Sequence, residues 1–405
     1  MSLRKLINRF ILCFSLLALT ACGGGGSFQT DNEKAGSLVS VKKVSTRSSA
    51  DINTALAQFS NRVSALYDVD NYEILYKTKN PEGNLITVSG LMSIPKKIQG
   101  AKSPRISYQH GTIFLDKDAP SKNHGVLDYE VIAASFGYIV TSPDYIGYGV
   151  SAGQPHPHTH AETLVGASLD LMRASKTWLK QKSIKENGQL FLMGYSEGGY
   201  ATYALQKKIE QELGTEFTVT ASVPAASAYN LTTTIQNLVN NPISTYLFYG
   251  FIIKGYDDAY QLKQINSMVK APYADVLSQY YDGTHSGREI AALLPPANSD
   301  ASVFFKAAYL QKVRNGEATL FTDKLSENNI DNWIPSAPTR FFQNPQDELV
   351  PFQAVEKMAL TLKNQGADVD LAICDANGAI TSHGNCFVPS LFFTTGFFLQ
   401  FATDL

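Results

Sequence analysis

A serine stands between glycines in Gly194-Tyr195-Ser196-Glu197-Gly198, which follows the pattern Gly-x-Ser-x-Gly and is extended by Gly199. A serine hydroxyl that attacks a carbonyl carbon must project from a tight strand-to-helix turn, where neighbouring side chains would obstruct the close packing of strand and helix. Residues 189–193 are almost wholly apolar and predict a buried strand, and residues 200–213 predict a helix. The pentapeptide alone is common by chance, but this context is not. We therefore predict that Ser196 is a nucleophile.

The base for such a serine has two candidates. A serine hydroxyl is a weak nucleophile near neutral pH, so a histidine must take its proton and an acid must orient the histidine. On a turn of this type the acid and then the histidine follow the serine along the chain. Beyond Ser196, His285 stands in a stretch without a strand pattern, whereas His383 follows the last predicted strand, at 369–373. We predict that His383 is the base; the alternative is a histidine on a surface loop.

The orienting acid is expected in a loop that directly follows a strand. Residues 339–343 predict such a strand, and the loop at 344–348 carries Asp347. We predict that Asp347 is the acid. Its neighbour Glu348 is the alternative, and Asp331 is less well placed because it precedes the strand.

An oxyanion hole requires two backbone N–H groups that point at the developing negative charge. The residue after the nucleophile, Glu197, is expected to supply one of them, a role in which its side chain has no part. The other is expected from the turn Gly111-Thr112, which follows a predicted strand at 105–109. Gly111 would allow the backbone to approach closely. The alternative is a simple glycine turn.

The first 21 residues have the pattern of an export signal. Three cationic residues precede the apolar run 10–18, which is too short to span a bilayer comfortably. The following Leu19-Thr20-Ala21-Cys22 looks like a bacterial lipobox, which implies a lipid on Cys22, and Gly23 resembles outer-membrane sorting. We predict a signal peptide at 1–21 and a lipid-anchored, flexible Gly/Ser/Lys-rich tether at 22–50. The alternative is an ordinary signal peptide cleaved nearby.

Two cysteines, Cys374 and Cys386, remain for the folded part of the chain, and they bracket His383. In an oxidising compartment, two cysteines separated by a short polar loop are expected to form a disulfide. Such a bond would also fix the position of the base. The alternative is a pair of free thiols.

Strands and helices alternate over most of the chain beyond residue 51. This pattern predicts a mostly parallel sheet flanked by helices, over 51–228 and 336–405. Residues 229–335 interrupt it with helical stretches that are rich in tyrosine and phenylalanine. We predict that this segment is an inserted, mainly helical cap or lid.

Composition excludes several classes of protein. The chain of 405 residues is 44% hydrophobic and 17% charged, which argues against disorder and against a membrane bundle. Its net charge is −2, and about −5 without the signal, so there is no basic footprint for nucleic acid. Protein partners are not identified by any pattern in the sequence.

Three motifs together resemble the secretory lipase family, that is, the Candida-type lipases and their bacterial relatives. They are Tyr-Gln-His-Gly-Thr at 108–112, Pro-Asp-Tyr-Ile-Gly-Tyr-Gly at 143–149 and Gly-Tyr-Ser-Glu-Gly-Gly at 194–199. The resemblance covers roughly residues 65–400 and is strongest at about 100–205. It implies an α/β-hydrolase fold with a helical lid, hydrolysis of carboxylic esters including lipids, and no cofactor. Glu197 departs from the glutamine that is common in the family, which could alter the local charge.

Three alternating histidines, His156, His158 and His160, suggest zinc as an alternative. No carboxylate or cysteine pattern completes a tetrahedral site, and the family resemblance places a turn here. We therefore expect no metal site.

The sequence thus predicts an exported, lipid-anchored lipase or carboxylesterase that acts through an acyl-enzyme. A serine peptidase of the prolyl-oligopeptidase type would share the core and the triad. That family usually places a propeller before the core, for which there is little room here. A non-catalytic binding protein on the same scaffold is a second alternative, but all three triad positions are filled.

Overall fold

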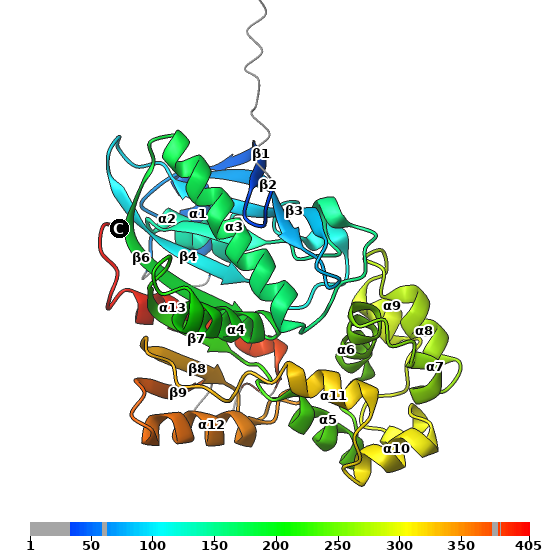
Figure 1. Ribbon diagram of the computed structural model, residues 1–405. Coiled ribbons are helices and arrows are strands. Elements are labelled where there is room, and N and C mark those ends of the chain that lie inside the picture. Colours follow the sequence, from blue (N-terminus) through cyan, green and yellow to red (C-terminus); the bar gives the residue numbers. More distant parts are fainter. Residues whose placement is uncertain (1–32, 59–62, 375–379, 381) are drawn as a thin grey trace, which may run out of the picture. The chain divides into compact units, whose positions relative to one another are not determined.

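The computed structural model describes residues 33–58, 63–374, 380 and 382–405. The fold belongs to the compact unit Lys34–Leu405 (Figure 1). The expected signal peptide at 1–21 and Cys22 lie outside the described residues. Within the described ranges, no helix is both long enough and apolar enough to cross a bilayer.

One sheet of nine strands organises this unit, in the order β1-β2-β3-β5-β4-β6-β7-β8-β9. Neighbours are antiparallel from β1 to β5 and parallel from β5 through β4 to β9. The strands are β1 (Leu38–Arg47), β2 (Val69–Lys79), β3 (Leu85–Pro95), β4 (Lys102–Gln109), β5 (Ile139–Pro143), β6 (Lys185–Tyr195), β7 (Val219–Ala225), β8 (Thr339–Gln343) and β9 (Val369–Ile373). This mostly parallel sheet confirms the predicted fold class.

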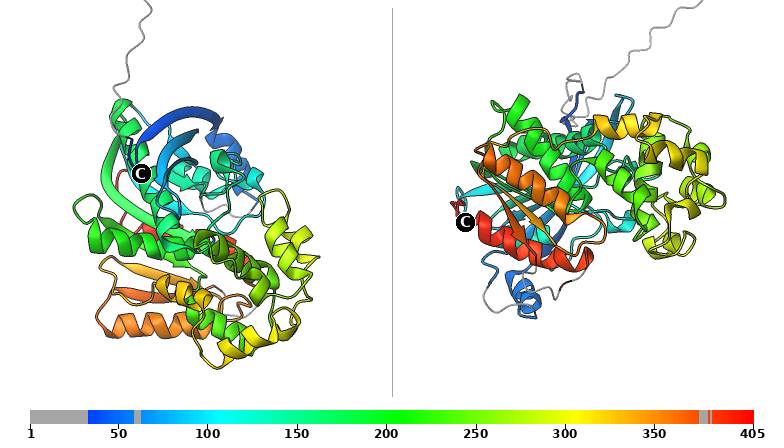
Figure 2. Two further views of the ribbon diagram at one scale, coloured as in Figure 1. Left: turned by 45° about the vertical axis from the view of Figure 1, so that its right-hand side comes forward. Right: turned by 90° about the horizontal axis from the view of Figure 1, so that it is seen from below.

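Strand β6 shows why helices cover both faces of the sheet. Its side chains alternate, so that Leu190 and Leu192 join one buried cluster while Phe191 and Met193 join another. The first cluster lies under α3 (Ala161–Gln181), α4 (Glu197–Glu212) and α12 (Phe352–Asn364); the second lies under α1 (Ser49–Leu56), α2 (Tyr129–Ser135) and α13 (Phe387–Phe398). Figure 2 shows α12 and α13 on opposite sides of the sheet. The continuous apolar run of β6 is what a doubly covered strand requires.

The predicted tether is wrong for its second half. Residues Leu38–Arg47 form β1, which pairs antiparallel with β2, and α1 begins at Ser49. Ser48 caps this helix by accepting the N–H of Asp51. Strand β1 lies at the edge of the sheet and its side chains are half-buried or exposed, so the segment carries no apolar alternation. A polar edge strand and a polar tether therefore look alike in sequence.

Between β7 and β8 the chain is helical, as predicted for the inserted segment. Its α-helices are α5 (Leu231–Asn240), α6 (Tyr246–Ala259), α7 (Ile265–Met268), α8 (Tyr273–Tyr280), α9 (Gly287–Ala291), α10 (Ala307–Arg314) and α11 (Leu320–Glu327). They gather at one end of the sheet (Figures 1 and 2). Many of their aromatic residues pack against one another; Tyr246 and Phe304, for example, are both almost fully buried with ring centroids 4.9 Å apart. The buried side chains of this segment thus extend the apolar core that lies on one face of the sheet.

Candidate active site

Ser196 occupies a strained turn between β6 and α4. Its backbone has φ 58° and ψ −124°, a combination that costs roughly 1–3 kcal/mol for a non-glycine residue and persists only where the surroundings impose it. The surroundings are close backbone segments. A Cβ on Gly198 would lie 1.9 Å from the carbonyl oxygen of Gln109, and a Cβ on Gly199 would lie 2.2 Å from that of Ala225. The glycines of the motif are therefore needed for β4, β7 and α4 to meet around the serine.

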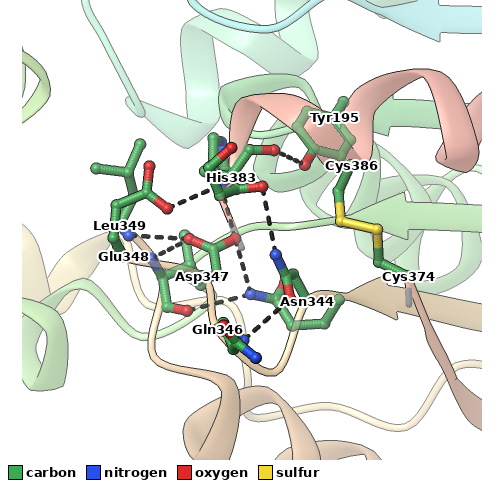
Figure 3. Close-up of polar contacts among 12 residues, drawn as sticks. Tyr195, Asn344, Gln346, Asp347, Glu348, Leu349, Cys374, His383 and Cys386 are labelled. Atoms are coloured by element: carbon green, nitrogen blue, oxygen red, sulfur yellow. Dashed lines mark hydrogen bonds and ion pairs between the residues drawn. A yellow bond between two sulfur atoms is a disulfide. The ribbon is translucent and has the colours of Figure 1, made fainter. Parts of the chain in front are cut away.

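His383 and Asp347 are in direct contact (Figure 3). Nδ1 of His383 lies 2.7 Å from Oδ2 of Asp347, and the Asp347 side chain is fully buried. Its other oxygen, Oδ1, accepts the backbone N–H groups of Leu349 and Val350, both at 2.9 Å. Gln343 donates from Nε2 to Oδ2 at 3.1 Å. These donors hold the carboxylate in one orientation, in which it accepts the Nδ1–H of the imidazole.

The other ring nitrogen of His383 is free. Nε2 is buried and has no hydrogen-bond partner within the described part of the chain, so it is not bonded to Ser196 in this structure. With Nδ1–H held by Asp347, the neutral ring has its lone pair on Nε2. That is the nitrogen a general base requires.

The side chain of Glu348 contacts the backbone of His383. Its Oε2 accepts the His383 N–H at 2.8 Å, while the Tyr195 hydroxyl donates to the His383 carbonyl. Asn344 donates to the carbonyl of Ser382 at 3.3 Å. Sequence reasoning treated Glu348 only as a rival to Asp347, because nothing in a loop sequence shows which carboxylate faces a ring and which faces a peptide N–H.

The expected disulfide is present. Cys374, just after β9, is bonded to Cys386, which directly precedes α13, and the two Cα atoms are 5.9 Å apart. The bond thereby ties the chain before the His383 loop to the chain after it (Figure 3). Residues 375–379 and 381 of that loop lie outside the described residues.

The turn after β4 lies against Ser196. A Cβ on Gly111 would lie 3.7 Å from Cβ of Ser196 and 3.0 Å from the carbonyl oxygen of Tyr195. Both segments expected to supply oxyanion donors, Gly111-Thr112 and the start of α4 at Glu197, are therefore next to Ser196.

The side chain of Glu197 has a role that sequence reasoning missed. It is buried, and its Oε1 lies 2.8 Å from Nε2 of His156 and accepts the Thr159 N–H at 3.2 Å. Its Oε2 lies 3.3 Å from Nε2 of His158. His160 lies apart from this group and hydrogen-bonds to Thr163 at 3.0 Å. Two of the three histidines considered for zinc thus have a carboxylate partner, on a residue some forty positions further along the chain.

Burial and charge set the protonation of this group. Burial opposes ionisation of Glu197, but its interactions with His158 and His156 and the N–H of Thr159 outweigh burial and lower its pKa to about 2. Burial lowers the pKa of His158 to about 4 against the opposing attraction of Glu197. At neutral pH, Glu197 is therefore ionised and His158 is neutral.

The remaining candidates lie elsewhere. His285 is half-exposed and contacts Asp282 at 3.0 Å in the helical insertion. Asp331 accepts a hydrogen bond from Asn230 at 3.0 Å. Neither contacts Ser196 or His383 in the part of the chain that the structure describes.

Comparison with known proteins shows to which family the chain belongs. The family model described as secretory lipase matches residues 128–385, more than half of the chain. The chain belongs to the secretory lipase family. Secreted triacylglycerol lipase LIP5 of Malassezia furfur is 28% identical over 315 residues, which are 72% of this chain and 73% of that protein.

Solved structures agree on the fold. The rice cell wall degrading esterase LipA of Xanthomonas oryzae matches with a TM-score of 0.81 and 23% identity, over 91% of this chain and 98% of its own. A putative hydrolase of Legionella pneumophila matches with a TM-score of 0.79 and 26% identity, over 90% and 98%. The predicted α/β-hydrolase fold is confirmed, and the family and its relatives establish this secretory lipase as a carboxylic ester hydrolase.

Proposed function

We propose that this enzyme cleaves carboxylic esters through an acyl-enzyme on Ser196, with His383 as the base and Asp347 as the orienting acid. The observation that carries the proposal is the 2.7 Å contact between His383 Nδ1 and Asp347 Oδ2, with His383 Nε2 left free. It occurs in a chain whose Gly-x-Ser-x-Gly serine has the strained backbone of a nucleophile turn.

The proposed reaction has an acylation step and a deacylation step. Ser196 Oγ attacks the ester carbonyl carbon as its proton passes to His383 Nε2, and the carbonyl oxygen becomes an oxyanion. The backbone N–H of Glu197 and one from the Gly111-Thr112 turn stabilise that charge. His383 then protonates the departing alkoxide as the C–O bond breaks. Water, deprotonated by the same nitrogen, attacks the acyl carbon. The bond between that carbon and Ser196 Oγ breaks, His383 returns the proton to Oγ, and the acid is released.

No cofactor is needed in this scheme. Every proton passes between Ser196, His383, the substrate and water, and every transient charge has a partner in the protein. Asp347 stays ionised and stabilises the imidazolium that forms on His383.

We assign the acyl side of the site to the helical insertion, bounded as the sequence suggests at 229–335 and acting as a cap. Phe114, two residues beyond Thr112, lies 5.5 Å from Phe251 and 5.8 Å from Phe248 of α6, measured between ring centroids. Phe251 is 5.1 Å from Tyr281. Apolar walls with few polar groups suit a fatty chain. The chain from the oxyanion turn thus leads directly into an aromatic cluster.

A panel of p-nitrophenyl esters from acetate to decanoate tests the activity and the pocket together. Each buried methylene contributes about 0.8 kcal/mol, so kcat/KM should rise from acetate towards medium chains before it levels off. Ser196→Ala should reduce hydrolysis of every ester by several orders of magnitude. A strict acetate preference would contradict the lipase-like pocket, and more than a few per cent residual turnover in Ser196→Ala would contradict the nucleophile. A proline-containing amide in the same panel tests the peptidase alternative.

We further propose that the protein is exported by residues 1–21 and anchored at the outer membrane through a lipid on Cys22. The lipobox-like sequence and the secreted relative support this assignment. Wild-type protein expressed with a labelled fatty acid should incorporate the label and fractionate with membranes, and Cys22→Ser should do neither. Unlabelled wild-type protein in the soluble fraction would contradict the anchor.

A further inference from the structure

The buried carboxylate of Glu197 has a complete set of partners that the ester chemistry does not use. His156 has an acceptor at each nitrogen, since Nδ1 lies 2.8 Å from the Ile146 carbonyl and Nε2 lies 2.8 Å from Glu197 Oε1. Glu197 and His156 therefore form a buried, hydrogen-bonded pair directly behind the proposed nucleophile turn.

His158 connects this pair to the oxyanion turn. Its Nε2 lies 3.3 Å from Glu197 Oε2 and 2.8 Å from the Thr112 hydroxyl oxygen. Its Nδ1 is buried and has no partner among the described residues. The proton of the neutral ring therefore belongs on Nε2, since a buried N–H without an acceptor costs about 1–3 kcal/mol. His158 thus bridges the two residues that flank the proposed oxyanion hole, Thr112 and Glu197.

A helix of the insertion covers the same cluster. Phe251 of α6 stacks on His158, with centroids 4.8 Å apart and planes at 28°, and presents its ring to His156 at 5.4 Å and 71°. Tyr256, five residues further along α6, donates from its hydroxyl to the Thr159 carbonyl at 3.0 Å. The backbone approaches closely as well, since a Cβ on Gly255 would lie 2.7 Å from the His158 nitrogen.

We propose that Glu197, His156 and His158 are positioning residues that hold the Thr112 turn and the start of α4 at the separation the oxyanion hole requires. The packing of Phe251 on both imidazoles makes this separation depend on the docking of α6. Among the described residues, none of the three side chains is hydrogen-bonded to Ser196 or His383. The inference rests on the proposed oxyanion hole. It adds the contacts that keep the Gly111-Thr112 turn and the backbone N–H of Glu197 at a fixed distance from each other.

Kinetics separate this role from simple packing. An oxyanion hole binds the transition state more tightly than the ester, so a misplaced donor lowers kcat and leaves KM nearly unchanged. A misplaced donor also weakens the binding of a boronic acid, because the tetrahedral adduct of that inhibitor on Ser196 places an oxygen in the oxyanion hole. A loss of packing alone lowers the melting temperature without that selective pattern.

The closest test is a pair of substitutions at His158. In His158→Gln, the amide N–H can reach the position of Nε2, whereas in His158→Asn it matches Nδ1 and leaves Thr112 and Glu197 unbridged. We expect His158→Asn to lower kcat for p-nitrophenyl butyrate about tenfold, below the 10²–10³ typical for outright loss of an oxyanion donor. KM should stay within about twofold, the Ki of butylboronic acid should rise by the same factor as kcat falls, and His158→Gln should recover most of both.

Two further variants test the pathway through Thr112 and Glu197. Thr112→Val keeps the branched shape but removes the hydroxyl, and its combination with His158→Asn should be no worse than the more harmful single change. Glu197→Gln should reproduce the kcat-selective loss because its amide has one acceptor oxygen, which cannot accept from both His156 and His158 as the two carboxylate oxygens do. Asp170→Asn is the matched control, since that buried carboxylate accepts from Thr78 at 2.8 Å and pairs with Arg173 on α3. It should change the melting temperature alone.

Equal kcat and boronate affinity in wild type, His158→Asn and Glu197→Gln would overturn the inference, as would full additivity of the Thr112 and His158 changes. The proposed function would survive such results provided that Ser196→Ala remains inactive. An active Ser196→Ala enzyme would instead overturn the proposed function itself. If His158→Asn does not fold, the double comparison is made with Thr112→Val and Glu197→Gln, and additivity there has the same meaning.

Discussion

The orientation of His383 depends on three contacts, two from adjacent residues of the loop after β8 and one from Tyr195 at the end of β6. Asp347 binds the ring, Glu348 binds the peptide N–H, and Tyr195 binds the carbonyl. The two adjacent carboxylates therefore bind different groups of His383. Only the ring contact sets which nitrogen carries the proton.

Asp347→Asn should lower kcat by roughly 10⁴, because an amide at this position favours the wrong tautomer of His383. Glu348→Gln should lower kcat only slightly, since the amide oxygen can still accept the His383 N–H. Steady-state kinetics with p-nitrophenyl butyrate measures both. If the two variants exchanged these effects, Glu348 would be the acid.

Part of this site was predictable from sequence, for a physical reason. Ser196, Asp347 and His383 each follow a strand, and the carboxyl ends of parallel strands lie at the same end of a sheet. Chain order was therefore enough to select these three candidates, two of which, Asp347 and His383, are in contact in the structure. The bond between Glu197 and the histidines was not predictable. It joins residues some forty positions apart whose side chains meet only because α4 and the 156–160 turn pack together.

At the scale of elements, the turn at Ser196 depends on how closely helix α4 approaches strand β4. Gly198 stands at the point of contact, where a Cβ would lie 1.9 Å from the Gln109 carbonyl. The strand before the serine and the helix after it are predictable from apolar patterns. Strand β1 was missed because an edge strand with few buried side chains has no such pattern.

Gly198→Ala should therefore prevent the native turn from closing and lower the free energy of unfolding by more than about 2 kcal/mol, as expected for overpacking against rigid backbone. Gly214→Ala is the control, because nothing lies within 4 Å of a Cβ there. Urea unfolding followed by circular dichroism compares the two. Equal stability of both variants would contradict the close approach of β4 and α4.

At the scale of the whole molecule, buried histidines make the stability of the fold depend on pH. Burial lowers the pKa of His158 and of His160 to about 4, against 6.5 for a free side chain. Each depressed pKa contributes stability that is fully present above pH 6.5 and is lost as the pH falls through 4. For one histidine the loss is on the order of 3 kcal/mol at most.

We expect the free energy of unfolding to fall between pH 6.5 and 4, and to fall less in His160→Gln than in wild type. His160 suits this test because it lies outside the Glu197 cluster and bonds to Thr163. Thr163→Val is the control, since it removes the partner and retains the imidazole. Urea titrations at pH 7.5 and 5.0 give the difference for each protein. An identical difference in wild type and His160→Gln would contradict a neutral, buried His160.

The central claim is that Ser196 is a nucleophile activated by His383, and covalent labelling tests it most directly. A fluorophosphonate forms a stable phosphonyl ester with an activated serine and loses fluoride, so digestion and mass spectrometry locate the modified residue. We expect a single adduct on the peptide that contains Gly194-Tyr195-Ser196-Glu197-Gly198, none in Ser196→Ala, and labelling slowed by several orders of magnitude in His383→Ala. An adduct on another residue, or undiminished labelling without His383, would contradict the account.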